Sequence, residues 1–154
     1  MSDTSDLPSV TRVAAYALAR DDAARLLLVR IAPGYQAVGQ WTLPGGGLNF
    51  GEEPAAAVVR ELEEETGLRG EIEGLAFVHS YSRGALPSVG DGPFHAIQIV
   101  YSVRIAGGEL RHEVDESTDM AAWVSLDEIH DLSLVDLVER ALSHIEADAV
   151  ALAD

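Results

Sequence analysis

Three glutamates lie close together in a segment whose composition favours a helix. Glu61, Glu64 and Glu65 are spaced i, i+3 and i+4, which places their carboxylates within an arc of about 100° on one helix face. Like charges at this spacing repel one another on an exposed helix. A hard cation such as Mg²⁺, which binds carboxylate oxygens, would remove this repulsion. For the three glutamates alone, a solvated acidic helix face is the favoured interpretation, and a cation site is the alternative.

The segment around these glutamates contains start and stop signals for a helix of about three turns. Pro54 suits the first helical position, where its missing N–H costs nothing. Gly67 is placed to end the helix in the left-handed conformation. One apolar stripe recurs at helical spacing, formed by Ala55, Val58, Val59 and Leu62.

A glycine-rich stretch, Leu43 to Gly47, comes shortly before this helix. Three consecutive glycines are unfavourable in a regular helix or strand, so the sequence predicts a turn here. Such a turn places bare backbone amides and carbonyls next to the carboxylates. This proximity favours a cation site over a solvated acidic face.

The 23 residues from Gly46 to Leu68 resemble the Nudix box, G-x5-E-x7-R-E-U-x-E-E-x-G-U, in which U is a bulky aliphatic residue. The fixed positions of the pattern are all matched, by Gly46, Glu52, Arg60, Glu61, Leu62, Glu64, Glu65, Gly67 and Leu68. The resemblance implies a loop–helix–loop that binds Mg²⁺ or Mn²⁺ and hydrolyses a nucleoside diphosphate linked to another group X. It also implies an α+β (mixed α/β) fold with a mixed β-sheet sandwiched between helices.

The resemblance assigns roles to residues of the box. The implied metal ligands are Glu61, Glu64, Glu65 and a backbone carbonyl of the glycine stretch, by position that of Gly45. Arg60 would hold a carboxylate of the box by ion pairing, and Glu52 would brace the loop against the helix. Glu64 is the expected general base, because it lies in the middle of the carboxylate arc.

A further acid outside the box often completes such a site. Four acidic residues follow the longest predicted strand: Glu113, Asp115, Glu116 and Asp119. Glu116, seven residues before Trp123, best matches the placement that the resemblance implies. We therefore expect Glu116 to join the catalytic residues.

Composition limits the other functions that the chain could have. It carries 26 acidic against 10 basic residues, a formal net charge of −16, which repels nucleic acid polymers and anionic membranes. All the basic residues are arginine, and neither Lys nor Cys occurs. Schiff-base catalysis, a Walker-type lysine, a thiolate nucleophile and a zinc–cysteine site are therefore excluded. With neither a signal-peptide pattern nor a long apolar run, a cytoplasmic protein is expected.

The remaining pattern predicts one domain over residues 9–154, after a disordered leader at residues 1–8. Strands are predicted at Arg12–Ala19, Leu26–Ile31, Trp41–Leu43, Glu71–Tyr81, Phe94–Ile105 and Ala121–Val124. The first two are expected to form a hairpin through Asp21–Ala24. The strand ending at Ile105 is expected to return at Glu109–Arg111, and a terminal helix is predicted at Leu134–Ala147.

Three residues outside the box are candidates for substrate binding: Arg30, Trp41 and Arg83. A surface arginine is the favoured interpretation of Arg30, and a core position is the favoured interpretation of Trp41. The expected partner is a small nucleotide-type molecule, with ADP-ribose or a nucleotide sugar favoured. Two alternatives remain: a housecleaning nucleoside triphosphate pyrophosphohydrolase, and a non-catalytic Nudix-fold ligand-binding module. The sequence also leaves a homodimer open.

Overall fold

The computed structural model describes residues 7–153, so most of the predicted leader lies outside the described residues. The strands are β1 (Val10–Leu18), β2 (Leu26–Ile31), β3 (Trp41–Thr42), β4 (Gly45–Gly47), β5 (Leu68–Arg83), β6 (Phe94–Gly108) and β7 (Thr118–Val124). The helices are α1 (Pro54–Thr66) and α2 (Asp136–Ala153), with short 3₁₀ turns η2 (Pro87–Val89) and η3 (Ile129–Asp131). Each predicted strand except the return at Glu109–Arg111 is present, and so is each predicted helix.

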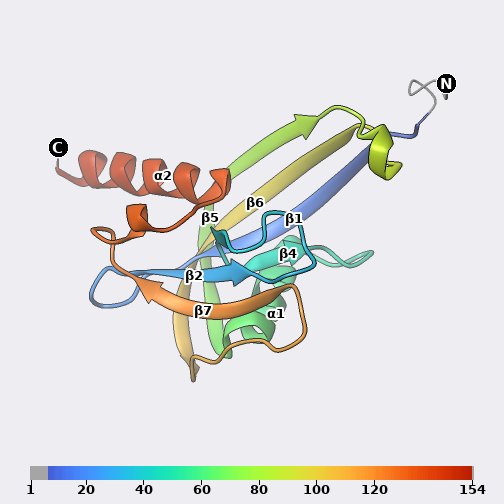
Figure 1. Ribbon diagram of the computed structural model, residues 1–154. Helices are drawn as coiled ribbons and strands as arrows, with labels where there is room; N and C mark the ends of the chain where they lie inside the picture. The colour runs from blue at the N-terminus through green and yellow to red at the C-terminus, as the bar shows by residue number, and fades with distance from the viewer. Residues whose placement is uncertain (1–6, 154) are drawn as a thin grey trace.

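The strands form two sheets, with orders β4-β1-β6-β5 and β3-β2-β7 (Figure 1). The first sheet is mixed, because β1 runs parallel to β6 while β4 and β5 are antiparallel to their neighbours. The predicted hairpin between β1 and β2 is limited to its turn. Arg20 and Leu26 form an antiparallel bridge, and the N–H groups of Asp21 and Leu27 donate to the carbonyls of Arg25 and Ala19, but the two strands then enter different sheets.

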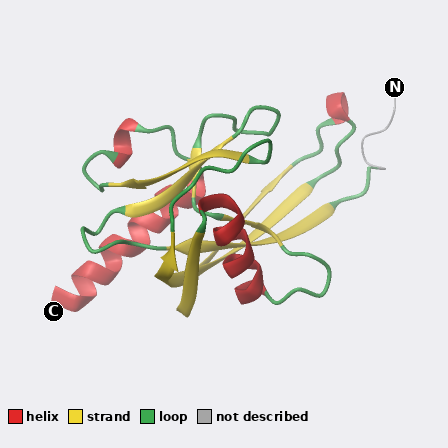
Figure 2. Ribbon diagram, turned by 90° about the horizontal axis from the view of Figure 1, so that it is seen from below, coloured by secondary structure: helices red, strands yellow, loops and turns green. Residues whose placement is uncertain are grey.

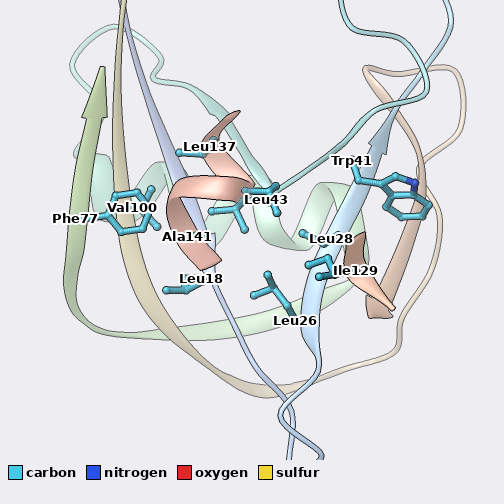
Figure 3. Close-up of a cluster of buried hydrophobic side chains, with 11 residues drawn as sticks. Leu18, Leu26, Leu28, Trp41, Leu43, Phe77, Val100, Ile129, Leu137 and Ala141 are labelled. Carbon is cyan, nitrogen blue, oxygen red and sulfur yellow. The ribbon is translucent and has the colours of Figure 1, made fainter. Parts of the chain in front are cut away.

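The two helices cover opposite faces of the four-stranded sheet (Figures 1 and 2). Alternate residues of β1 and β2 point to opposite sides, as strand geometry requires. One core joins α2 to Leu18, Leu26 and Leu28, and Figure 3 shows Leu137 and Ala141 of α2 among these side chains. The second core joins α1 to Ala15, Ala17, Leu27 and Val103. The predicted mixed sheet between helices is therefore confirmed, although a second sheet accompanies it.

The glycine stretch differs from its prediction, because Gly45–Gly47 is a strand rather than a turn. These residues pair with β1, Gly47 opposite Ala14 and Gly45 opposite Tyr16. A Cβ placed on Gly45 would lie 2.2 Å from the carbonyl oxygen of Ala15, so no larger residue fits. The glycines thus allow two backbones to approach closely. From sequence alone, consecutive glycines predict only a turn.

The end of the chain also departs from the prediction. Helix α2 begins at Asp136 rather than Leu134, because Leu134 bridges to Trp41, and it continues beyond Ala147. Residues Glu109–Arg111 are not a strand. The backbone N–H of Arg111 instead donates to the carbonyl of Thr66 at the end of α1. No helix among residues 7–153 has the length and apolar character needed to span a membrane.

Candidate functional site

Helix α1 positions the acidic residues through its two ends and its buried face. It starts at Pro54 and ends at Thr66. The next residue, Gly67, has a left-handed φ of 76°, and its N–H donates to the carbonyl of Glu63. Val58 and Leu62 are fully buried against the sheet. These contacts fix the rotation of the helix, so its remaining faces point to defined places.

Glu65 lies on the buried side of α1, with only 2 % of its surface exposed. Its Oε2 accepts a hydrogen bond of 3.1 Å from the N–H of Gly45 in β4. Burial raises the pKa of the Glu65 carboxyl well above its usual range, and the charge of Glu61 raises it further. Glu65 is therefore a carboxyl group whose ionised form is disfavoured unless a cation lies beside it.

Arg60 binds the carboxylates on the other side of the helix. Its Nε and Nη2 each donate to the carboxylate of Glu52 at 2.9 Å, and its Nη1 donates to Glu61 at 3.0 Å and to Glu64 at 3.3 Å. Glu52 also accepts from the N–H of Asn49 at 3.0 Å. The Arg60 guanidinium is the main cause that lowers the pKa of Glu52 to about 2. The predicted ion pairing of Arg60 is confirmed, and Glu52 links the loop to the helix.

Glu113 is an acid outside the box whose charge interacts with Glu61, Glu64 and Glu65. Partial burial raises the pKa of Glu113, and the charges of Glu116, Glu61 and Glu64 raise it further. Its Oε2 accepts a hydrogen bond of 2.9 Å from the hydroxyl of Thr118. Glu116, the residue chosen from sequence, is exposed. The charge of Glu113 is thus coupled to those of Glu61 and Glu64, and the role of Glu116 stays a prediction.

The loop that carries Glu113 is held at both ends. The guanidinium of Arg111 donates to the backbone carbonyls of Glu63 and Glu64 at 3.1 and 3.4 Å, at the C-terminal end of α1. The N–H of Ala121 donates to Nδ1 of His112 at 3.0 Å. These bonds fix the loop beside the acidic face of the helix. Sequence spacing gave no signal for them, since they join segments far apart in the chain.

The donor set has the chemistry of a divalent-cation site. Glu61 and Glu65 are neighbours, and the glycine strand β4 runs beside them with its backbone exposed to a ligand. Within residues 7–153, no three Asp, Glu, His or Cys side chains already converge on one point. Glu64, whose side chain is half exposed, faces Arg60 instead. Two of the predicted carboxylate ligands therefore lie together, and Glu61 and Glu64 both accept a hydrogen bond from Nη1 of Arg60.

A cleft of about 810 Å³ opens beside these groups. Its lining includes Glu61, Glu65 and the three glycines of β4, together with residues of the open sheet face: Arg12, Tyr16, Tyr81, Arg83, Phe94 and Gln98. Of these last six, only Arg83 was chosen from sequence. Arg12, Tyr16 and Gln98 lie on central strands, where alternation alone gives the same pattern as a half-buried sheet face.

The other two substrate-binding candidates lie elsewhere. Trp41 is 9 % exposed and belongs to the core between α2 and the smaller sheet (Figure 3), so its predicted core position is confirmed. Arg30 pairs with Asp119 at 2.8 Å, and its guanidinium carbon lies 5.9 Å from the centre of the Trp41 ring. Neither side chain lines the cleft.

Comparison with known proteins gives matches over most of the chain. The family model of the NUDIX domain matches residues 10–144. A MutT-like protein from Streptomyces ambofaciens is 30% identical over 130 residues, which cover 80% of this chain and 74% of the relative. A NUDIX hydrolase structure from Nitrosomonas europaea has a TM-score of 0.72 at 25% identity, covering 90% of each chain.

Other relatives are matched over a smaller part of their length. A Mycobacterium tuberculosis protein with the provisional name 8-oxo-dGTP diphosphatase 2 is 33% identical, over 71% of this chain and 70% of the relative. An ADP-ribose pyrophosphatase from Methanocaldococcus jannaschii is 40% identical over 47% of this chain. The chain spans only between 24% and 40% of the length of that relative and several others.

Proposed function

The chain belongs to the NUDIX family, and from this premise we propose that it is a pyrophosphohydrolase that uses a divalent metal ion to cleave a diphosphate linkage in a small nucleotide. The observation that carries the proposal is the placement of the acidic face of α1. Glu61 and Glu65 lie beside the glycine strand β4, at one end of a cleft large enough for a nucleotide. A solvated acidic surface would not bury Glu65 to 2 % exposure.

Hydrolysis requires one water molecule and no covalent intermediate. The water oxygen attacks one phosphorus of the diphosphate, and the bond from that phosphorus to the bridging oxygen breaks. The products are a nucleoside monophosphate and phosphorylated X. One proton of the water passes to a base, the other stays on the new P–OH group until that group ionises, and the bridging oxygen leaves with the other phosphate. A divalent ion, when bound, would neutralise the charge of the diphosphate and acidify the water.

The side chains of the site would bind the metal ion, accept a proton and orient the carboxylates. Glu61 and Glu65, with Glu64 and the carbonyl of Gly45, would hold the ion. Glu64, which is half exposed, would accept the proton of the attacking water. Arg60 orients Glu61 and Glu64 through the bonds described above and is in turn held by Glu52. Glu113 adds a carboxylate from the neighbouring loop.

A nucleoside diphosphate linked to X, such as ADP-ribose or a nucleotide sugar, is the favoured substrate. The net charge of −16 disfavours a polymer, and the cleft suits a small molecule. The match to a protein named ADP-ribose pyrophosphatase supports this class. The longer match to a protein provisionally named 8-oxo-dGTP diphosphatase supports a second candidate, hydrolysis of an oxidised nucleoside triphosphate to the monophosphate and pyrophosphate.

A substrate panel tests both candidates. The purified protein is incubated with ADP-ribose, nucleotide sugars, dinucleotides and normal and oxidised nucleoside triphosphates, with Mg²⁺ or Mn²⁺ and with EDTA. We expect metal-dependent release of a monophosphate, at a rate that rises at alkaline pH because the attacking water must lose a proton. Release of phosphorylated X or of pyrophosphate separates the two classes. Absence of turnover with every substrate and metal would refute the proposed activity.

A further inference from the structure

One arginine of the cleft lacks a carboxylate partner in the described part of the chain. Seven of the ten arginines donate to a carboxylate or a backbone carbonyl within residues 7–153. The other three are Arg12, Arg69 and Arg140, and Arg140 lies over the ring of Phe77 at 4.9 Å. Only Arg12 among these three lines the cleft. Its charge and its donors are therefore available to a ligand.

Arg12 lies directly beside the glycine strand. A Cβ added to Gly47 would lie 3.0 Å from both Nε and Nη2 of Arg12, whereas one added to Gly46 would lie 3.0 Å from Oε1 of Glu61. Successive residues of a strand point to opposite faces, so Arg12 and Glu61 flank β4 from its two faces. Because β4 is an edge strand and both side chains line the cleft, the cleft passes around this edge. A ligand at the edge can reach both groups.

A row of residues leads from Arg12 across the open sheet face. Arg12 pairs with Ala96, and Ala96 pairs with Tyr81, so two strand spacings of about 5 Å each separate Arg12 from Tyr81. Ala96, which lies between them, has only a methyl side chain and is 6% exposed beneath its larger neighbours. Tyr81 is 48% exposed and lies 6.3 Å from the ring of Phe94, over which Arg83 lies at 5.1 Å. These ends of β1, β5 and β6 extend beyond both helices, which leaves the face open (Figure 1).

The two ends of this row suit different parts of a nucleotide. A guanidinium forms charge-assisted, two-pronged hydrogen bonds with phosphate oxygens. Exposed aromatic rings stack on nucleobases, and an arginine beside them strengthens the contact. In a chain with a net charge of −16, a local cation also offsets the repulsion that an anionic substrate meets at the cleft.

We propose that Arg12 binds a phosphate of the substrate at the edge of β4, and that the attached nucleoside extends over Ala96 toward Tyr81 and Phe94. This inference rests on the proposed function and adds the orientation of the substrate. The diphosphate lies at the acidic end of α1, and an aromatic base lies at the far end of the strands.

Equilibrium binding tests the inference without turnover. The probe is α,β-methylene ADP, whose phosphate bridge resists hydrolysis, titrated by calorimetry into the full chain with Mg²⁺ present. We expect Arg12→Ala to raise Kd by about tenfold, equivalent to about 1.4 kcal/mol, and Arg12→Lys to raise it less. Arg69→Ala is the matched control, because it removes the same charge outside the cleft and should leave Kd nearly unchanged.

Adenosine, which has no phosphate, separates the two ends of the row. Arg12→Ala should leave adenosine binding unchanged, whereas Tyr81→Ala should weaken the binding of both adenosine and the diphosphate probe. Equal weakening of probe binding by Arg12→Ala and Arg69→Ala would overturn the inference, and so would loss of adenosine binding in Arg12→Ala. Failure of the wild-type chain to bind the probe would overturn it too, while the substrate panel decides the proposed activity separately. If Arg12→Ala fails to fold, Arg12→Gln takes its place in both titrations.

Discussion

The structure places two glutamates near α1 in opposite environments. Glu52 accepts three hydrogen bonds, two of them from Arg60, and its pKa falls to about 2. Glu65 is buried beside Glu61 with a single hydrogen bond from the N–H of Gly45, and its pKa is raised. The first environment stabilises a negative charge with protein groups alone. The second environment disfavours a negative charge, so the Glu65 carboxylate would be stabilised by a bound metal ion.

This contrast separates the supporting part of the site from its binding part. The arginine-paired region, Glu52 and Arg60, can hold the loop before α1 in place whether or not a metal is bound. The buried region, Glu65 with Glu61, gains most from a cation, because binding offsets both desolvation and repulsion. Glu64 lies between them, bound to Arg60 yet half exposed.

The largest expected effect comes from Glu64→Gln, which tests whether this intermediate position is catalytic. If Glu64 accepts the proton of the attacking water, kcat should fall by about 10²- to 10⁴-fold. Stability in EDTA should change little, because the side chain is half exposed and makes one bond of 3.3 Å. Single-turnover kinetics and a thermal melt measure the two effects, with the exposed neighbour Glu63→Gln as the control. A near-normal rate would place the base elsewhere, and an unfolded variant would make Glu64 structural.

A smaller effect is expected from Mg²⁺ on stability, which tests whether the buried region binds the cation. A site saturated at about 100 times its Kd adds about 2.7 kcal/mol, equivalent to about 5 to 10 °C in Tm for a domain of this size. Na⁺ at matched ionic strength measures general screening of the acidic surface. The specific shift should vanish when Glu61, Glu64 and Glu65 are all replaced by Gln. An equal shift in wild type and triple variant would identify a solvated acidic face.

The smallest expected effect is in the pH dependence of stability, where the two environments should give opposite slopes. Glu65 has a raised pKa in the folded protein, so the metal-free protein loses stability as pH rises from about 4.5 through that raised value. Glu52 has a lowered pKa, so its contribution is present above about 4.5 and is lost as pH falls toward 2. Thermal melts in EDTA across the pH range measure both effects. Glu65→Gln should remove the loss of stability at rising pH, and Glu52→Gln should remove the loss at falling pH. Variants that change stability in the same direction across the pH range would contradict the contrast.

The sequence by itself determined the features that depend on local spacing. Pro54, Gly67 and the apolar spacing between them fix where α1 begins, ends and faces, because helix geometry depends only on near neighbours. The same spacing brings Glu61 and Glu65 together and lets Arg60 reach Glu64 one turn away. The box could therefore be found without a structure, and its resemblance to a known family implied the ion pairing of Arg60.

Only the tertiary structure decided which distant segments meet. It made Gly45–Gly47 an edge strand, because hydrogen bonding to β1 stabilises an extended backbone that glycine by itself disfavours. It brought the loop that carries Glu113 beside the acidic face through the bonds of Arg111 and His112. It also placed Arg12 beside Gly47. Strand pairing and burial set these contacts between residues far apart in the chain. The spacing of residues along the chain does not predict which distant segments pair or become buried.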